Sequence, residues 1–435
     1  MNAQTIAAAG AGRRFAPLLR AVRARPWLVL VPASILFVAV PLVVPYSDNL
    51  YDDEGAYVGL GKLLASGHLL TGRDTMVGGG NAPPNLWFGP GLPAVLAALV
   101  KLHASLDVLR LVGPVALFAA LVSFYALLRL FVPVRAALLG AAAFIAYLPF
   151  YTVIAFIHAE PLAVLFVTLL LYATVRYERE GRGRWLTLGA CSFAALAITR
   201  VAYGWVMTAV LVAAAIAYLV RRDERRRRLL LVPALALVLC VPWLGYTYSV
   251  THHALYWGSS GAMSLYWMSS PADQDVGDWH GANDVFSDPN LAAHRPYFRS
   301  LIGLDLNAQN HSLEHHALDN VSNHPFKFAQ NVADNISRMW LNTPYSFKSA
   351  RLTSVGYALP NLLLLFGLVA AAVRTVRRRT GRPGLTAGWM GVFAVVAFGL
   401  HSVFSAYPRM LIPIVPIALL AIVTGLRPIA RVERD

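Results

Sequence analysis

The sequence predicts an all-α protein that crosses a membrane many times. Of its 435 residues, 57% are hydrophobic and only 14% are charged, and the mean hydropathy is +0.55. A soluble domain carries about 25% charged residues, so this composition is typical of a chain embedded in a bilayer. The apolar residues also gather in long runs that short arginine-rich loops separate.

Ten of these runs are apolar and long enough to predict membrane-spanning helices, although several fall short of the roughly 20 residues of a full span. They lie near 27–45, 109–130, 135–151, 160–177, 185–200, 202–219, 229–250, 354–373, 386–406 and 408–426. An eleventh run, 90–102, is shorter and follows the turn-forming residues Gly89, Pro90 and Gly91.

The distribution of positive charge predicts that 90–102 does not cross. Without that crossing, the arginine-rich runs at 221–228 and 374–382 share a side with the N-terminus, and the positive-inside rule makes this side cytoplasmic. We therefore expect 90–102 to be re-entrant or to lie on the outer surface. The run at 27–45 follows five arginines and shows no cleavage site, so we expect a retained anchor in the plasma membrane with a cytoplasmic N-terminus.

This topology divides the chain into three parts. Residues 1–250 form an N-terminal transmembrane module with a first outer loop at 46–108; residues 251–353 form an extracytoplasmic loop subdomain; residues 354–435 form the C-terminal helices. The net charge of +15 lies mainly in the cytoplasmic loops, so we expect no nucleic-acid partner. The sequence contains no phosphate-binding glycine motif.

An acidic cluster follows the first span. Asp52, Asp53 and Glu54 precede a run with an apolar face at helical spacing, which predicts a helix along the outer membrane surface. Carboxylates near lipid usually serve chemistry or ion handling. The alternative is that Asp52 or Asp53 only caps this helix.

A second acidic motif contains His158, Glu160 and Pro161. The proline suits the first turn of a helix, which places Glu160 at the positive end of the helix dipole. Glu160 could be only a capping residue. His158 beside it makes the pair a possible site for a divalent metal, and this alternative stays open.

Cations stand at the outer ends of several spans. Arg200 and Arg409 each end or begin a predicted span on the outer side, with Lys348 and Arg351 just before another. Such arginines can extend to lipid headgroups, but two that converge can bind a phosphate bidentately. We expect Asp53 and these arginines to meet in one cavity at the outer leaflet.

A further outer helix is predicted near 323–340, starting at an Asn-His-Pro sequence. Phe326, Val332, Ile336 and Trp340 fall on one stripe of this helix, which is typical of a helix lying on a membrane surface.

In this order, these pieces resemble the GT-C superfamily of integral membrane glycosyltransferases, in the branch of protein O-mannosyltransferases and the lipid A aminoarabinose transferase. The motifs that carry the resemblance are Asp53-Glu54-Gly55-Ala56-Tyr57, Pro83-Pro84, Asp107 to Leu111, His158-Ala159-Glu160, Leu196 to Arg200, His324-Pro325-Phe326 with Trp340, and Arg409 to Pro416. They extend over nearly the whole chain.

The resemblance implies a GT-C fold and an inverting transfer of a hexosyl or pentosyl group from a polyprenyl-phosphate sugar. The acceptor would be an extracytoplasmic glycan, lipid or protein of the cell envelope. Asp53 would be the general base, with Asp52 as the alternative residue for this role, and Glu160 would orient the acceptor.

The resemblance further implies that Arg200, Arg409, Arg351 and Lys348 bind the donor phosphate. Glu54, Tyr57 and His158 would contact substrate. The sequence departs from the family in having Asn81 and Ala82 before Pro83 and a single Glu160 instead of two acids, which leaves the role of a metal open.

Two other functions are compatible with the same features. One is a transporter or flippase of lipid-linked saccharides, although the sequence shows no clear internal repeat. The other is a non-catalytic envelope-assembly protein whose outer loop binds a partner.

Overall fold

The protein is all-α, as the sequence predicts. The computed structural model describes residues 31–32, 35–40, 50, 53–68, 76–78, 86–349, 354–377 and 385–425. Within these residues the regular structure is helical, apart from an isolated bridge between Tyr345 and Lys348. The predicted span at 27–45 is described only in part.

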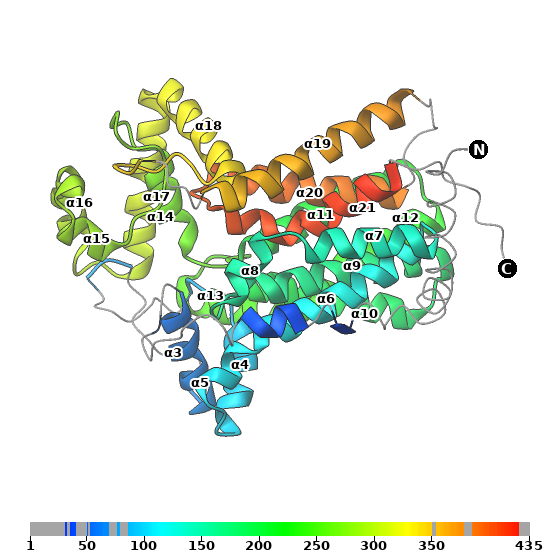
Figure 1. Cartoon of the computed structure of the whole chain (residues 1–435). Helices are drawn as coiled ribbons and strands as arrows, with labels where there is room; N and C mark the ends of the chain where they lie inside the picture. The colour runs from blue at the N-terminus through cyan, green and yellow to red at the C-terminus, as the bar shows by residue number, and fades with distance from the viewer. Residues whose placement is uncertain are drawn as a thin grey trace.

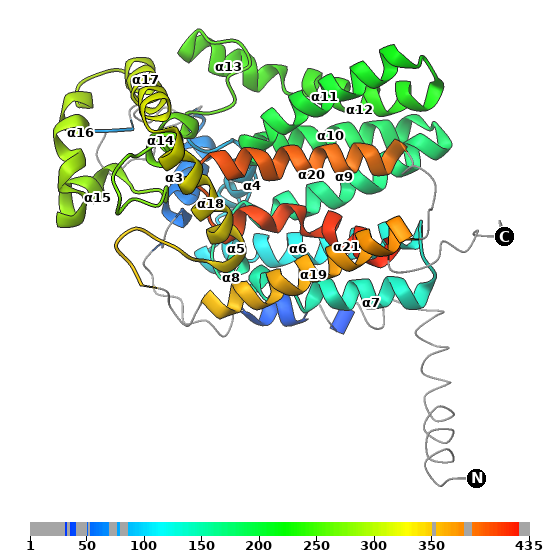
Figure 2. The same cartoon turned by 90° about the horizontal axis from the view of Figure 1, so that it is seen from above.

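The apolar helices form one bundle (Figures 1 and 2). They are α6 (Val112–Arg129), α7 (Val134–Ile145), α8 (Pro149–Ile154), α9 (Glu160–Glu180), α10 (Gly183–Thr199), α11 (Ala202–Val220), α12 (Glu224–Leu239), α13 (Val241–Thr251), α19 (Val355–Arg377), α20 (Leu385–Val403) and α21 (Val415–Gly425). Helix α9 packs against α6 and α10 and is the most buried of the candidate spans.

Fewer helices pass as full spans than the ten or eleven that the sequence predicts. Within the described residues, six are long and apolar enough to cross, or seven if the pair α12 and α13, bent by 50°, is one span. The predicted span at 135–151 is broken into α7 and α8, with Pro149 opening the second piece, and the span at 185–200 is the 17-residue α10. Prolines near helix starts explain such breaks, since they cannot continue a preceding helix.

Helices α3 (Glu54–Ala65), α4 (Gly91–Lys101) and α5 (Leu106–Arg110) form a spur at one end of the bundle (Figure 1). With 11 residues, α4 is too short to cross a bilayer core of about 30 Å. It packs closely on α3, because a Cβ on Gly61 would lie 2.9 Å from the Cβ of Leu96. The structure therefore gives 90–102 as a short packed helix and not as a span.

The chain between α13 and α19 forms a helical region beside the bundle with its own small core. Its elements are α14 (Ser260–Met268), α15 (Ala282–Ser287), η1 (Pro289–His294), α16 (Arg295–Leu301), α17 (Leu306–Asn323) and α18 (Pro325–Leu341). Tyr266, Trp267 and Phe298 are buried at its centre. Gln309 of α17 accepts hydrogen bonds from the backbone of Met76 and Val77, which ties the first outer loop to this region.

Helix α18 has a buried polar face and a predicted apolar stripe that is only partly exposed, since Val332, Ile336 and Trp340 are half-buried. Phe326, on the stripe, is 90% exposed, whereas Asn335 and Arg338 are fully buried. The Asn335 side-chain amide donates to the carbonyl oxygens of His401, Ser402 and Phe404, and Arg338 donates to that of Ala406. Helix α18 thus fixes the chain that follows α20.

Candidate active site

Asp53 stands immediately before α3, and its neighbour Glu54 anchors that end of the helix. Arg110 of α5 donates two hydrogen bonds to Glu54, at 2.8 Å and 3.0 Å, and both side chains are buried. The backbone amide of Ile157 also donates to Glu54, at 3.3 Å. Asp53 makes no side-chain capping bond to α3, so the alternative of a simple cap does not account for it.

Two arginines from distant segments reach the same place. Arg200 ends α10 in an extended conformation, and Arg409 lies in η3 (Pro408–Ile414). The guanidinium of Arg409 lies 2.7 Å from the carboxylate of Asp53. Arg200 lies 2.5 Å from the buried Glu160, and the Nε atom of Arg409 is 3.7 Å from the same carboxylate oxygen. Two acids and two arginines therefore alternate in one chain of charges.

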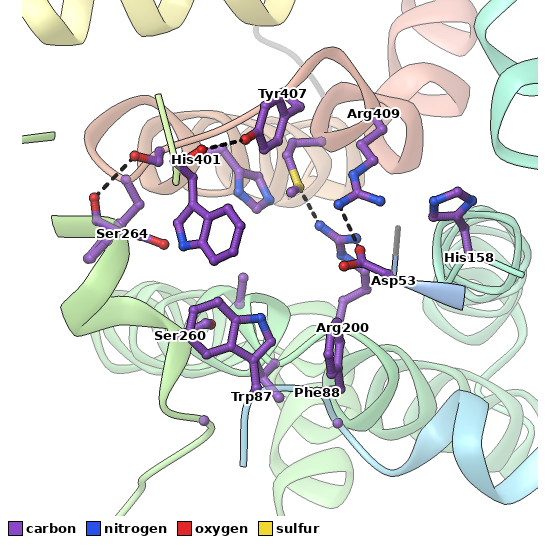
Figure 3. A pocket seen from close by; sticks show the side chains of 18 of the residues that line it. Asp53, Trp87, Phe88, His158, Arg200, Ser260, Ser264, His401, Tyr407 and Arg409 are labelled. Atoms are coloured by element: carbon purple, nitrogen blue, oxygen red, sulfur yellow. Dashed lines mark hydrogen bonds and ion pairs between the residues drawn. The ribbon is translucent and has the colours of Figure 1, made fainter. Parts of the chain in front are cut away.

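Asp53, Arg200 and Arg409 of this group line one side of a cavity of about 700 Å³ (Figure 3). Asp53, Tyr57, His158, Arg200 and Arg409 all contribute to its wall. Asp53, Arg200 and Arg409, which the sequence predicts to meet, thus lie at the wall of one cavity. Burial raises the pKa of Tyr57, so its phenol is protonated at neutral pH and can donate a hydrogen bond.

The remaining predicted site residues either do not line the cavity or lie outside the described residues. Glu54 and Glu160 are buried behind the cavity wall and are not among its lining residues. Lys348 is exposed and does not line the cavity. Asp52 and Arg351 lie outside the described residues.

Sequence reasoning missed the aromatic part of the wall. It includes Trp87, Trp205, Trp257, Trp279 and Tyr407, together with His401 near the end of α20. These side chains come from separate loops and helices, and in sequence they resemble ordinary membrane-interface aromatics. No local motif signals their convergence.

The charges do not fit a metal centre. In the described part of the chain, no group of three or more His, Cys, Asp or Glu side chains could hold a metal ion. Glu160 faces two guanidinium groups, which would repel a divalent cation. Among the described residues, Glu160 and His158 therefore do not belong to a set of ligands that fits a metal ion.

Residues 87–246 match the family model described as dolichyl-phosphate-mannose-protein mannosyltransferase. No curated protein matches the chain. Among solved structures, the oligosaccharyltransferase AglB from Archaeoglobus fulgidus, in complex with an inhibitory peptide and a dolichol-phosphate, is 12% identical, with a TM-score of 0.51 over 91% of this chain and 50% of its own.

The apo form of the Archaeoglobus fulgidus oligosaccharyltransferase is 13% identical, with a TM-score of 0.53 over 92% of this chain and 50% of its own. The chain thus spans about half the length of these enzymes. ArnT from Cupriavidus metallidurans, bound to undecaprenyl phosphate, aligns at 15% identity over 91% of this chain and 78% of its own, but its TM-score of 0.42 is too low to support an argument.

At such identities a structural match establishes the fold alone. That fold, the described helices that could cross a membrane and the partial family match agree with one another. The chain is a polytopic membrane protein whose fold is similar to that of these membrane oligosaccharyltransferases, and part of it matches the mannosyltransferase family model.

Proposed function

We propose that the protein is an inverting glycosyltransferase that moves a sugar from a polyprenyl-phosphate donor to a hydroxyl of an extracytoplasmic acceptor. The observation that carries the proposal is the contact of 2.7 Å between Asp53 and Arg409 at the wall of a cavity that Arg200 also lines. A carboxylate next to two cations suits a reaction that removes one proton and releases one phosphate.

The two arginines suit the donor phosphate. Among the described lining residues, Arg200 and Arg409 are the cations with a permanent charge, and their planar guanidinium groups match phosphate oxygens in bidentate geometry. An incoming phosphate competes with Asp53 for Arg409. Donor binding would then release the carboxylate oxygen that now contacts Arg409.

The proposed reaction is a single displacement. The acceptor hydroxyl gives its proton to Asp53 while its oxygen forms a bond to the anomeric carbon. The bond between that carbon and the phosphate oxygen breaks, and its electron pair leaves with polyprenyl phosphate. Arg200 and Arg409 stabilise the negative charge on this leaving group, and attack from the opposite face inverts the anomeric configuration.

The cavity also suits a lipid carrier. Trp205 of α11 lines it while remaining 48% exposed on a candidate span, and Tyr357 of α19 lines it on another. A long prenyl chain could leave the cavity along either helix into the bilayer. Transport alone would not require a base beside the phosphate site.

We place the cavity on the extracytoplasmic side of the plasma membrane. Helix α9 begins beside the cavity and ends near Arg179 and Arg182, and α11 begins beside it and ends at the arginine run 221–228. The arginines therefore cluster at the end of the bundle away from the cavity, and the positive-inside rule makes that end cytoplasmic.

The test is incubation of the purified protein in lipid nanodiscs with a panel of radiolabelled polyprenyl-phosphate hexoses and pentoses. Transfer or hydrolysis is measured for the wild type, for Asp53→Asn and for the control Asp319→Asn, whose side chain is 57% exposed on α17. We expect Asp53→Asn to lose turnover and to keep donor binding, while the control keeps both. Full turnover by Asp53→Asn would refute the proposal, as would donor movement across vesicles without cleavage.

A further inference from the structure

The cavity has a second part whose chemistry differs from that of the charged group. Figure 3 shows Asp53, Arg200 and Arg409 towards one side and Ser260 and Ser264 towards the other. The wall of this second part consists of aromatic and neutral polar residues, namely Trp87, Trp257, Ser260, Ser264, Trp279 and His401.

Three polar atoms around this part lack a hydrogen-bond partner among the described residues. They are Nε1 of Trp257, Nε1 of Trp279 and Nε2 of His401. Trp257 is 1% exposed and His401 is 9% exposed. Buried polar atoms are nearly always hydrogen-bonded in folded proteins, so three such atoms in residues that line one cavity are candidates to bond a polar ligand or water.

The surrounding structure fixes these side chains. Trp257 packs against Gly204, and its carbonyl accepts a hydrogen bond from Trp243 at 3.2 Å. The carbonyl of Trp279 accepts one from Tyr407 at 3.0 Å. These two tryptophans are therefore held in place before any ligand arrives, which reduces the ordering cost of binding.

His401 is fixed in the same way and lies next to the proposed phosphate site. Asn335 holds its carbonyl at 2.9 Å, and its ring lies 6.0 Å from the ring of Tyr203. The backbone amide of Tyr203 in turn donates to the carbonyl of Arg200 at 2.8 Å. The ligand group that meets His401 is therefore close to the group that binds Arg200.

A sugar ring suits such a wall. Its C–H faces pack on aromatic rings, and its hydroxyls both donate and accept hydrogen bonds, as indole and imidazole nitrogens require. Trp87 and Trp279 are already in edge-to-face contact, with ring centroids 5.6 Å apart.

The charge of the wall restricts which sugar fits. Asp53 is the one carboxylate among the described lining residues, and the second part contributes none. An ammonium group on the sugar would therefore be desolvated without an anionic partner, a cost that the faces of the tryptophan rings offset only in part. Hydroxyl groups carry no such cost here.

We infer that Trp87, Trp257, Trp279 and His401 form the glycosyl subsite of the donor, and that this subsite takes a neutral, hydroxyl-bearing sugar and not an amino sugar. The inference rests on the proposed function, since it assumes that the sugar is attached to the phosphate that Arg200 and Arg409 bind.

The test compares hydrolysis of polyprenyl-phosphate mannose and of polyprenyl-phosphate 4-amino-4-deoxyarabinose without acceptor. We expect the wild type to prefer the neutral donor. Trp279→Phe and His401→Leu should each raise the KM for the neutral donor about tenfold, as the loss of one hydrogen bond predicts. Binding of polyprenyl phosphate without sugar should stay unchanged, and His401→Gln should recover part of the loss.

Trp389→Phe is the matched control. The Nε1 atom of Trp389 also lacks a partner among the described residues, yet this tryptophan does not line the cavity. Equal use of both donors by the wild type would overturn the inference, as would equal loss of sugar-free polyprenyl phosphate binding in the variants. Binding of polyprenyl phosphate with no turnover of any donor would instead overturn the proposed function and remove the basis of the inference.

Discussion

The guanidinium of Arg409 lies 2.7 Å from the carboxylate of Asp53, although Asp53 precedes α3 and Arg409 precedes α21, the last described helix of the bundle. Both side chains are mostly buried, at 17% and 24% exposure. An ion pair so shielded resists screening by salt better than one at the surface. It also joins two segments that are far apart in the sequence at the wall of the cavity.

Arg409→Gln is expected to weaken binding of polyprenyl phosphate about 10- to 100-fold, since it removes a charged hydrogen-bond donor from the proposed phosphate site. The affinity of Arg409→Lys for polyprenyl phosphate should lie between those of the wild type and Arg409→Gln, because lysine keeps the charge but not the bidentate geometry. Titration of the protein in nanodiscs with a fluorescent polyprenyl phosphate measures the effect. Arg299→Gln, at an exposed position of α16, should bind like the wild type. An unchanged affinity in Arg409→Gln would exclude this arginine from the phosphate site.

Glu160→Gln is expected to bind polyprenyl phosphate more tightly and to turn over more slowly. Glu160 is buried and contacts both Arg200 and Arg409, so its charge competes with the donor phosphate for the same two cations. Neutralising it should favour the anion, including the product that must leave. Affinity and single-turnover rates separate the two effects. A loss of affinity equal to that of Arg200→Gln would mean instead that Glu160 serves to position the arginine.

The sequence predicts the parts of this site that carry charge. Asp53, Arg200 and Arg409 could be identified because a charged side chain near lipid is costly and usually has a function. Their pairing could not be predicted, since it depends on how α10, η3 and α3 approach one another. The ion pair of Glu54 with Arg110 could not be predicted either, because Arg110 lies in a separate helix.

The aromatic wall and the broken helices were not predictable in the same way. Trp257 and Trp279 look in sequence like aromatic residues of a membrane interface, and only the fold brings them to one cavity. The run at 229–250 reads as one apolar segment, but Pro242 opens a new helix and the pair bends by 50°. Apolar composition predicts that a segment lies in the bilayer and does not predict whether it is straight.

The buried pair of Glu54 and Arg110 is expected to show strong energetic coupling. Either Glu54→Leu or Arg110→Met leaves a buried group without its partner, which should destabilise the protein by about 3–5 kcal/mol. The double variant Glu54→Leu/Arg110→Met should recover much of this loss, since neither charge remains. Unfolding in detergent measures all four proteins. Additive effects of the single variants would show that the pair contributes no specific interaction.

Gly204→Ala should damage the cavity wall without weakening α11 itself. A Cβ at this position would lie 2.0 Å from the Trp257 ring, well inside contact distance, so Trp257 must move. Alanine otherwise favours a helix over glycine by up to about 1 kcal/mol. Gly245→Ala, in α13, meets nothing within 4 Å and is the matched control. We expect Gly204→Ala to lower kcat/KM for a neutral sugar donor at least about tenfold and Gly245→Ala to leave it unchanged. Wild-type kinetics in Gly204→Ala would mean that the position of Trp257 does not matter to the substrate.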